Sequence, residues 1–379
     1  MCDILKHTTM KTGDKTMKKI HRTLSLFTVA AMCAALLCSC GEVPDSSQTD
    51  SSSKSATTTT ADTTTTGEAN STASATSAPD SSVSDNSSSV TDDTKTNGIT
   101  PAMWKVTSPE GNTMVMLGSF HALKDECYPL PEAVTNAYNN ADILAVECDI
   151  TSTSEDGEYM KNLMKQMLYN DNTKLSQHIS EKAYSALQTY LGYWGMDISA
   201  LEVYRPWAVS STLDTLLIQD SDFDTEKGLD NFLLTTAHAD GKEIYEVESV
   251  DFQMNMLINF SDDIYDLMFR SYEGETKESQ KQALEDLYTA WKSGDIETFL
   301  EEDNEEELAG YTEEDKKIAE DYNNQMLYDR NKNMAKAAED LMSQGKNVFY
   351  VVGAAHYAGE GGIIDLLEKD GYTAERVQY

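Results

Sequence analysis

Two histidines in this chain occur in the same short pattern, Gly-x-x-His, and each pattern directly follows an apolar segment. The first pattern runs from Gly118 to His121 and the second from Gly353 to His356, while a third apolar segment leads into Glu147. Imidazole and carboxylate groups transfer protons and bind divalent metal ions. Two histidines and an acid brought together would therefore form a catalytic or metal-binding site.

A Gly-x-x-His pattern alone is a weak signal. With 20 Gly and 6 His in the chain, about 0.3 such patterns are expected by chance. For either histidine alone a structural role is favoured, in which the side chain caps a neighbouring helix or fills a polar notch. The pair indicates a functional site, because both histidines follow strand-like segments and an acid follows a third.

The elements around these residues predict an α/β fold. We expect a mostly parallel central sheet that starts with a β-hairpin, contains two strand-to-Gly-x-x-His corners, and carries a large helical middle segment over about 159–345. Ligands bind at the carboxyl ends of strands in such sheets, where both histidines and Glu147 would lie. The expected strands are 104–107, 113–117, 143–148, 348–352 and 373–377, and the expected helices around them are 131–141, 333–344 and 362–369.

Residues 1–39 read as an export signal. Lys18, Lys19 and Arg22 precede an apolar run of 14 residues from Leu24 to Leu37, which is short for a membrane span of about 20 residues. The run ends in Leu-Cys-Ser-Cys-Gly, which resembles a bacterial lipoprotein signal-peptidase site. That resemblance implies cleavage before Cys40, a lipid on Cys40, and a location on the outer face of the cytoplasmic membrane, exposed to the extracellular side. An ordinary secretory signal cut nearby is the alternative.

Residues 40–98 form a different segment, and 99–379 form the folded domain. Half of residues 41–98 are Ser or Thr, and none is Leu, Ile, Met or aromatic. Such a segment buries too little apolar surface to offset its ordering entropy, so we expect a disordered tether. The acidic run 301–307 is predicted to be a solvated helix face or loop, not a metal site.

The charge of the chain excludes some classes of partner. The formal net charge is −36 at pH 7, and a field of that sign repels phosphates and anionic lipid headgroups. We therefore expect no nucleic-acid partner, and contact with the membrane through the lipid anchor only.

An ordered set of motifs over about 103–379 resembles the TraB/GumN family, which includes the Tiki proteases. The set comprises Leu117 to His121, Tyr128 to Pro131, Ala141 to Asp149, Gly228-Leu229-Asp230, Val247-Glu248-Ser249 with Gln253, Asp329-Arg330-Asn331, and Val351 to His356. The resemblance implies an α/β core in which the two Gly-x-x-His corners, with motif glycines Gly118 and Gly353, meet an acid.

The resemblance also implies metal-dependent cleavage of a peptide or protein substrate, with manganese or cobalt favoured over zinc. Carried over to this chain, the metal ligands are His121, Glu147 and His356. Arg330 would stabilise a developing oxyanion, and either Glu248 or Glu147 would be the general base.

Two alternatives to a metallopeptidase remain open. One is a metal-independent, esterase-like hydrolase in which His121 or His356 is the general base. The other is a non-catalytic lipoprotein that binds a peptide or pheromone.

Other residues with chemical potential are assigned structural roles. We expect His178 on a polar surface, His238 near a helix C-terminus, and Arg205 in ordinary packing around a Pro-Trp corner, although it could reach a pocket. Ser119 lacks the glycine-flanked elbow of serine hydrolases. Cys127 and Cys148 are expected to remain unpaired, with a disulfide as the alternative.

Overall fold

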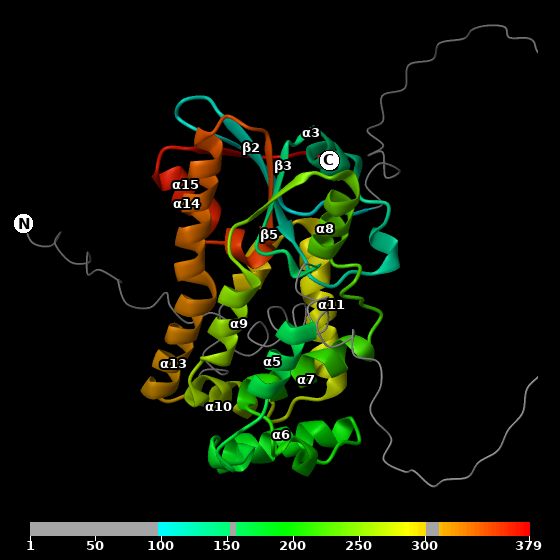
Figure 1. The fold of residues 1–379 in the computed structure, drawn as a ribbon, viewed down its shortest axis with the longest axis vertical. Helices are drawn as coiled ribbons and strands as arrows, with labels where there is room; N and C mark the ends of the chain where they lie inside the picture. Colours follow the sequence, from blue (N-terminus) through cyan, green and yellow to red (C-terminus); the bar gives the residue numbers. More distant parts are fainter. Residues whose placement is uncertain (1–97, 152–156, 301–310) are drawn as a thin grey trace, which may run out of the picture. The chain divides into compact units, whose positions relative to one another are not determined.

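The computed structural model describes residues 98–151, 157–300 and 311–379 (Figure 1). The predicted signal peptide, Cys40, the tether and the acidic run 301–307 lie outside the described residues, so these predictions stay predictions. Within the described ranges, no helix combines the length and the apolar composition that crossing a membrane requires.

A six-stranded sheet organises the upper part of the molecule in Figure 1. Its strand order is β4-β3-β5-β2-β1-β6. Strands β4, β3, β5 and β2 are mutually parallel, and β1 pairs antiparallel with both β2 and β6. The strands are β1 (Met103–Thr107), β2 (Thr113–Ser119), β3 (Ile143–Val146), β4 (Glu243–Glu246), β5 (Val348–Gly353) and β6 (Thr373–Arg376). The predicted α/β class with a mostly parallel sheet and a hairpin start is confirmed.

Helices make up most of the described residues outside the sheet. In chain order, the α-helices are α3 (Glu132–Asn140), α5 (Gly157–Gln166), α6 (Glu181–Tyr193), α7 (Pro206–Gln219), α8 (Leu229–Asp240), α9 (Val250–Ile258), α10 (Asp262–Arg270), α11 (Lys277–Ser293), α13 (Glu313–Asn323), α14 (Asp329–Ser343) and α15 (Ile363–Lys369). Short 3-10 turns lie at Asp125–Cys127, Leu175–Gln177, Ile198–Leu201, Ile296–Leu300 and Ala354–Tyr357. A π-helical segment, η5 (Asn324–Tyr328), joins α13 to α14 without a break.

Two hydrophobic clusters stabilise this arrangement. One surrounds the sheet and includes the five apolar residues of β5, a strand whose six residues are all buried. The other lies among the helices of the middle segment, and includes Leu187, Trp207 and Phe269. A strand buried on both faces shows a continuous apolar run, which is why β5 is readable from sequence.

Strand β4 differs from the sequence-based prediction, which placed residues 243–246 in a mostly helical segment. The strand has four residues, and its burial pattern leaves three of them exposed. It lies at the edge of the sheet, where one side has no partner strand. An edge strand this short and polar has no apolar run by which to recognise it.

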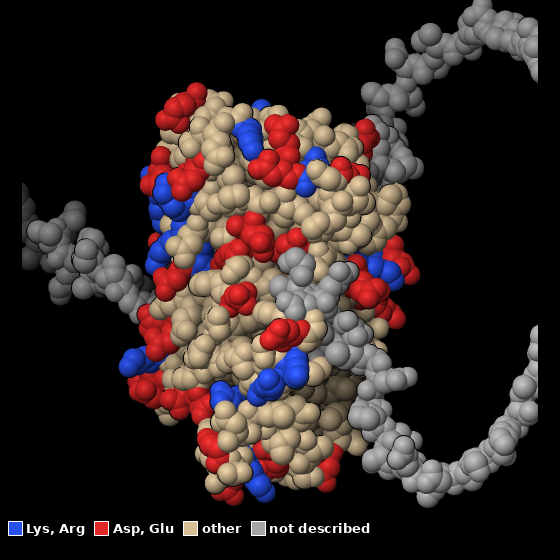
Figure 2. Space-filling model, in the orientation of Figure 1, with Lys and Arg blue, Asp and Glu red and all other residues tan. Residues whose placement is uncertain are grey.

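Acidic side chains lie over both the sheet part and the helical part on the face shown in Figure 2. Lys and Arg side chains are interspersed among them. The coloured residues of this face present no continuous basic surface, as expected from the net charge of −36.

Candidate active site at the ends of three parallel strands

Parallel pairing brings the predicted site residues to one edge of the sheet. Strand β5 lies between β3 and β2, with Val351 beside Val146 and Gly353 beside Ser119. His121, Glu147 and His356 each follow the carboxyl end of one of these strands. Because parallel strands end at the same edge, residues more than 200 positions apart become neighbours.

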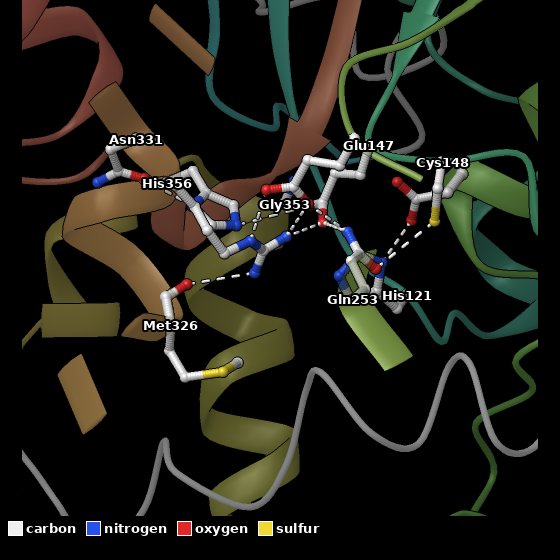
Figure 3. Close-up of polar contacts among 11 residues, drawn as sticks. His121, Glu147, Cys148, Gln253, Met326, Asn331, Gly353 and His356 are labelled. Carbon is white, nitrogen blue, oxygen red and sulfur yellow. Dashed lines mark hydrogen bonds and ion pairs between the residues drawn. The ribbon is translucent and has the colours of Figure 1, made fainter. Parts of the chain in front are cut away.

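The three side chains converge on the space above Gly353 (Figure 3). A Cβ atom on Gly353 would lie 3.1 Å from Glu147 Oε1, 3.4 Å from His121 Nε2 and 3.5 Å from His356 Cδ2. Glu147 Oε1 also accepts a hydrogen bond from Gly353 N at 2.7 Å and lies 3.7 Å from His356 Nε2. The missing side chain of Gly353 therefore leaves a small space lined by both imidazoles and the carboxylate.

His121 is oriented by Asp230, in the first turn of α8. Its Nδ1 atom lies 2.7 Å from Asp230 Oδ2, which leaves Nε2 facing Gly353. Burial by itself lowers the pKa of His121, but the Asp230 carboxylate and its hydrogen bond outweigh burial and raise the pKa to about 9.

Gly228 allows α8 to approach the His121 turn. A Cβ atom at Gly228 would lie 2.2 Å from the carbonyl oxygen of His121, a distance that no side chain tolerates. Gly228 is also the N-cap of α8. Close backbone contact at Gly228 therefore places Asp230 against the histidine ring.

His356 is oriented by an amide instead of an acid. Asn331 Nδ2 donates to the carbonyl of Gly361 at 2.9 Å, so Asn331 Oδ1 is the acceptor for His356 Nδ1, 2.7 Å away. The hydrogen of the neutral ring is thus on Nδ1, and the lone pair is on Nε2. Burial lowers the pKa of His356, and the nearby Arg330 charge lowers it further, to about 3.

Arg330, from α14, forms hydrogen bonds to two carboxylates, those of Glu147 and Glu248. Its Nη2 donates to Glu147 Oε2 at 2.6 Å and to Glu248 Oε2 at 2.8 Å, and its Nε donates to Glu248 Oε1 at 2.8 Å. Gln253 Nε2 bridges the same two carboxylates at 2.9 and 2.6 Å. Burial raises the pKa of Glu147, but the charge of Arg330 overrides this and holds that pKa well below its usual range.

The hydrogen bonds of Arg330 change the role expected for it. Nε and Nη2 are occupied by the two glutamates, and Nη1 donates to the carbonyl of Met326 at 3.2 Å. The side chain is 2% exposed. These contacts favour a positioning role for Arg330 over the predicted contact with an oxyanion.

The donor atoms of this site can be compared with those that a divalent metal ion requires. Among the described residues, no group of three or more His, Cys, Asp or Glu side chains stands in a formed metal-binding arrangement. The donor chemistry nevertheless fits, because His121 Nε2, Glu147 Oε1 and the His356 ring border the space above Gly353, and His356 Nε2 lies 3.7 Å from Glu147 Oε1. In addition, each ring has its Nδ1 held by an acceptor, as is usual for metal-bound histidines.

Three further residues of this site were part of sequence motifs but had no predicted role. Asp230 belongs to the Gly-Leu-Asp motif, Asn331 follows Arg330, and Gln253 follows the Glu248 block. Each is now seen to hold one of the central side chains. The signal that marked them was their motif membership, since residues 230 and 331 are too far from either histidine for spacing to suggest a contact.

The remaining predicted residues lie outside the site or behind it. Gly118 packs against Ala354, where a Cβ atom would lie 3.0 Å from that residue's Cα and Cβ atoms. Ser119 is buried. Cys127 and Cys148 are free thiols, and Cys148 Sγ lies 3.5 Å from Gln253 Oε1.

The other two histidines of the described residues lie away from the site. His178 lies at the surface with its side chain 25% exposed, and its ring nitrogens contact Asp262 at 2.8 Å and Thr173 at 2.8 Å. Its ring also stacks on that of Tyr169. His238 lies in the last turn of α8, as predicted.

Comparison with known proteins agrees with this architecture. A sequence model of the TraB/PrgY/gumN family matches residues 102–376, and the chain therefore belongs to that family. No solved structure matches the chain significantly.

Several curated proteins are similar to the chain at low identity. A protein named metalloprotease TIKI homolog, from Nematostella vectensis, is 25% identical over 293 residues, which cover 66% of this chain and 61% of that protein. The uncharacterized protein YbaP from Escherichia coli K12 is 28% identical over 157 residues, or 41% of this chain and 56% of YbaP. Metalloprotease TIKI2 from Danio rerio is 25% identical over 164 residues, or 39% of this chain and 32% of that protein. The chain thus spans less than two thirds of the length of these relatives.

Proposed function

We propose that this protein is a metal-dependent hydrolase that cleaves peptide bonds in a peptide or protein substrate. The observation that carries the proposal is the convergence of His121 Nε2, Glu147 Oε1 and the His356 ring above Gly353. Similarity to proteins named metalloproteases supports the reaction class. We further propose that a lipid on Cys40 holds the enzyme on the outer face of the cytoplasmic membrane, as the signal sequence suggests.

His121, Glu147 and His356 would hold the metal ion, with manganese or cobalt as the favoured metals. When bound there, a divalent ion polarises a substrate carbonyl and lowers the pKa of a bound water molecule. Asp230 and Asn331 keep the two rings oriented, so that neither ring has to rotate when an ion binds. Because the pKa of His121 is raised to about 9, its Nε2 proton would leave on metal binding.

Glu147 and Glu248, either of which the sequence allowed as the general base, have different surroundings. Both oxygens of Glu248 are bound by Arg330, whereas Glu147 presents Oε1 to the space above Gly353. We therefore assign contact with the reacting groups to Glu147. Glu248 is a positioning residue that acts through Arg330 and Gln253.

A double-mutant cycle on the two histidines tests the proposal. His121→Ala and His356→Ala should each abolish tight manganese binding and reduce peptide cleavage about 1000-fold, because the groups act as one unit. The double variant should then lose no more activity than the worse single variant. Metal content after dialysis against manganese, cleavage of a peptide library and melting temperature are the three measurements.

His238→Ala is the matched control, since His238 also bonds a carboxylate but lies outside the site. Its metal content and activity should equal those of the parent. Additive losses of stability with unchanged metal content would refute a shared metal site. Lost activity with manganese retained in both single variants would instead support the metal-independent hydrolase.

A further inference from the structure

A cavity of about 170 Å³ lies among the helices, apart from the candidate active site. Aromatic and aliphatic side chains, including Trp207, Phe260 and Ile258, form much of its wall. Helix α9 connects the two sites, because Gln253 contacts Glu147 and Ile258 lines the cavity. Five residues of α-helix separate them by about 7.5 Å along the helix axis.

Two hydrogen-bond donors in the cavity wall are buried without a partner among the described residues. These are the Tyr169 hydroxyl and Arg205 Nε. Burial and the nearby Asp262 charge raise the pKa of Tyr169, so that its hydroxyl keeps its hydrogen at neutral pH. Unpaired buried polar groups are costly, and a pair of them lining one cavity indicates a missing acceptor.

The other polar groups of the wall already have partners. Trp207 Nε1 donates to the carbonyl of Gln166, and the Tyr265 hydroxyl donates to that of Leu257. His178 bonds Asp262 through Nδ1 and Thr173 through Nε2. Asp171, in turn, accepts from the backbone and hydroxyl of Thr173. The buried atoms of the wall that lack a partner among the described residues are therefore both donors, whereas the carboxylates of Asp171 and Asp262 belong to exposed residues at its edge.

The backbone places the residues that carry these two donors side by side. Residues 167–169 run beside residues 203–205, with Arg205 N donating to the carbonyl of Met167 at 2.8 Å and Tyr169 N donating to that of Val203 at 3.0 Å. The Arg205 guanidinium lies 6.0 Å from the centre of the Tyr169 ring. The two donors are therefore near enough to line the same cavity.

We propose that this cavity binds a carboxylate carried by a small apolar or aromatic group, with Arg205 and Tyr169 as its hydrogen-bond donors. A cavity of about 150 Å³ accommodates a benzene ring, so the volume here suits one side chain of that size. The C-terminal residue of a peptide and a free aromatic or aliphatic acid share this chemistry. The proposal concerns binding alone and does not depend on the proposed hydrolase activity.

Calorimetric titration of the intact chain with N-acetyl-phenylalanine and with N-acetyl-phenylalaninamide tests the proposal. The two probes have nearly the same size, but only the first carries a carboxylate. The acid should bind at least about tenfold more tightly, because hydrogen bonds to charged groups are the stronger ones. Equal binding of acid and amide, or no binding of either, would overturn the proposal.

Variants separate the two donors from general effects on the fold. Arg205→Gln should remove the preference for the acid. Tyr169→Phe keeps the ring and should weaken acid binding about two- to tenfold. Lys182→Gln, in an exposed ion pair with Glu273, changes the net charge equally and should have no effect. A preference for the acid that persists in Arg205→Gln and Tyr169→Phe would contradict the assignment.

Two further measurements locate the binding and identify its source. His356→Ala should bind the acid as the parent does, and loss of binding in that variant would place the probe in the candidate active site and refute the cavity. A pentapeptide ending in phenylalanine extends the acid by four residues. Tighter binding of the pentapeptide would identify a peptide end as the ligand, and equal binding would identify a small free acid; both results support a carboxylate site.

Discussion

Two arginines in this protein, Arg330 fully buried and Arg270 partly buried, each bond a pair of carboxylates, in different regions and with different consequences. Arg330 lies between Glu147 and Glu248 at the edge of the sheet. Arg270, at the end of α10, lies between Asp266 of the same helix and Asp315 of α13.

The difference lies in how the carboxylate oxygens are used. Asp315 Oδ1 accepts a hydrogen bond from Arg270, and Asp315 Oδ2 accepts from the backbone N and the hydroxyl of Thr312, which completes the capping box of α13. Asp266 Oδ2 likewise accepts from Arg270, and Asp266 Oδ1 accepts from Ser180 N. All four oxygens thus make structural contacts: Asp315 Oδ1 and Asp266 Oδ1 connect one helix to another, and the other two oxygens bond within or cap their own helix.

In the Arg330 cluster, one oxygen has a second environment. Glu147 Oε1 accepts from Gly353 N but also borders the space shared with both histidines. An arginine–carboxylate cluster thus has a structural role when all its carboxylate oxygens bond other parts of the fold. It has a functional role when one of these oxygens also borders a site, as Glu147 Oε1 does.

The largest expected effect is on activity. Glu147→Gln keeps the shape of the side chain and removes its charge, so peptide cleavage should fall about 1000-fold, or about 4 kcal/mol of transition-state stabilisation. Asp315→Asn makes the same chemical change in the Arg270 cluster and should keep activity within about twofold of the parent. A Glu147→Gln enzyme with near-parent turnover would remove the functional distinction between the clusters.

The next effect is on stability. Arg330→Met leaves Glu147 and Glu248 buried without a cation, which should lower the free energy of unfolding by about 3–5 kcal/mol. Arg270→Met should cost less, because the side chains of Arg270 and Asp266 are 20% and 16% exposed and water partly solvates the remaining charges. Urea denaturation at pH 7 measures both, and an equal or larger loss for Arg270→Met would contradict this ranking.

The smallest expected effect is a pH dependence of stability. Burial alone raises the pKa of Asp315, but Arg270 and the Thr312 cap override it and lower the pKa from 3.8 to about 2. The carboxylate therefore stabilises the folded state fully above about pH 4, and this stabilisation, about 2 kcal/mol, is lost as the pH falls toward 2.

The Asp315→Asn variant isolates that contribution. Its free energy of unfolding should be lower than the parent's at pH 7, and the difference should shrink between about pH 4 and pH 2. Denaturation curves at several pH values provide the measurement. An Asp315→Asn variant that loses stability toward acid as steeply as the parent would assign the acid sensitivity to other groups.

The strands that position the site were predictable because they are strongly patterned. Val348 to Val352 forms a continuous apolar run, and the hairpin of β1 and β2 has a Pro-Glu-Gly-Asn turn between alternating strands. The parallel arrangement then followed from the β-α-β order. The convergence of His121, Glu147 and His356 was expected on this basis, and the structure places them around one space.

The partners of these residues were not predictable from periodicity. Asp230 and Asn331 lie on helices whose sequence shows which face is apolar but not where each helix docks on the sheet. The docking of α8 depends on a backbone contact at Gly228, which leaves no periodic signal. The cavity around Arg205 was only the alternative to ordinary packing for a similar reason, since the sequence of a Pro-Trp corner does not show whether the corner packs fully or leaves a space.

The π-helical segment between α13 and α14 sets the rotational phase of the helix that carries Arg330 and Asn331. In an α-helix each residue turns the chain by about 100°, and a π-helical turn contains one residue more than an α-helical turn. The extra residue therefore rotates α14 relative to α13 about their common axis. The half before it keeps Asp315 and Tyr322 buried among the helices, while the half after it presents Arg330 to Glu147 and Asn331 to His356. Deleting one residue within 324–328 would rotate α14 relative to α13 by about a quarter turn. This rotation would move Arg330 and Asn331 away from the site although the deletion removes none of the residues that line it.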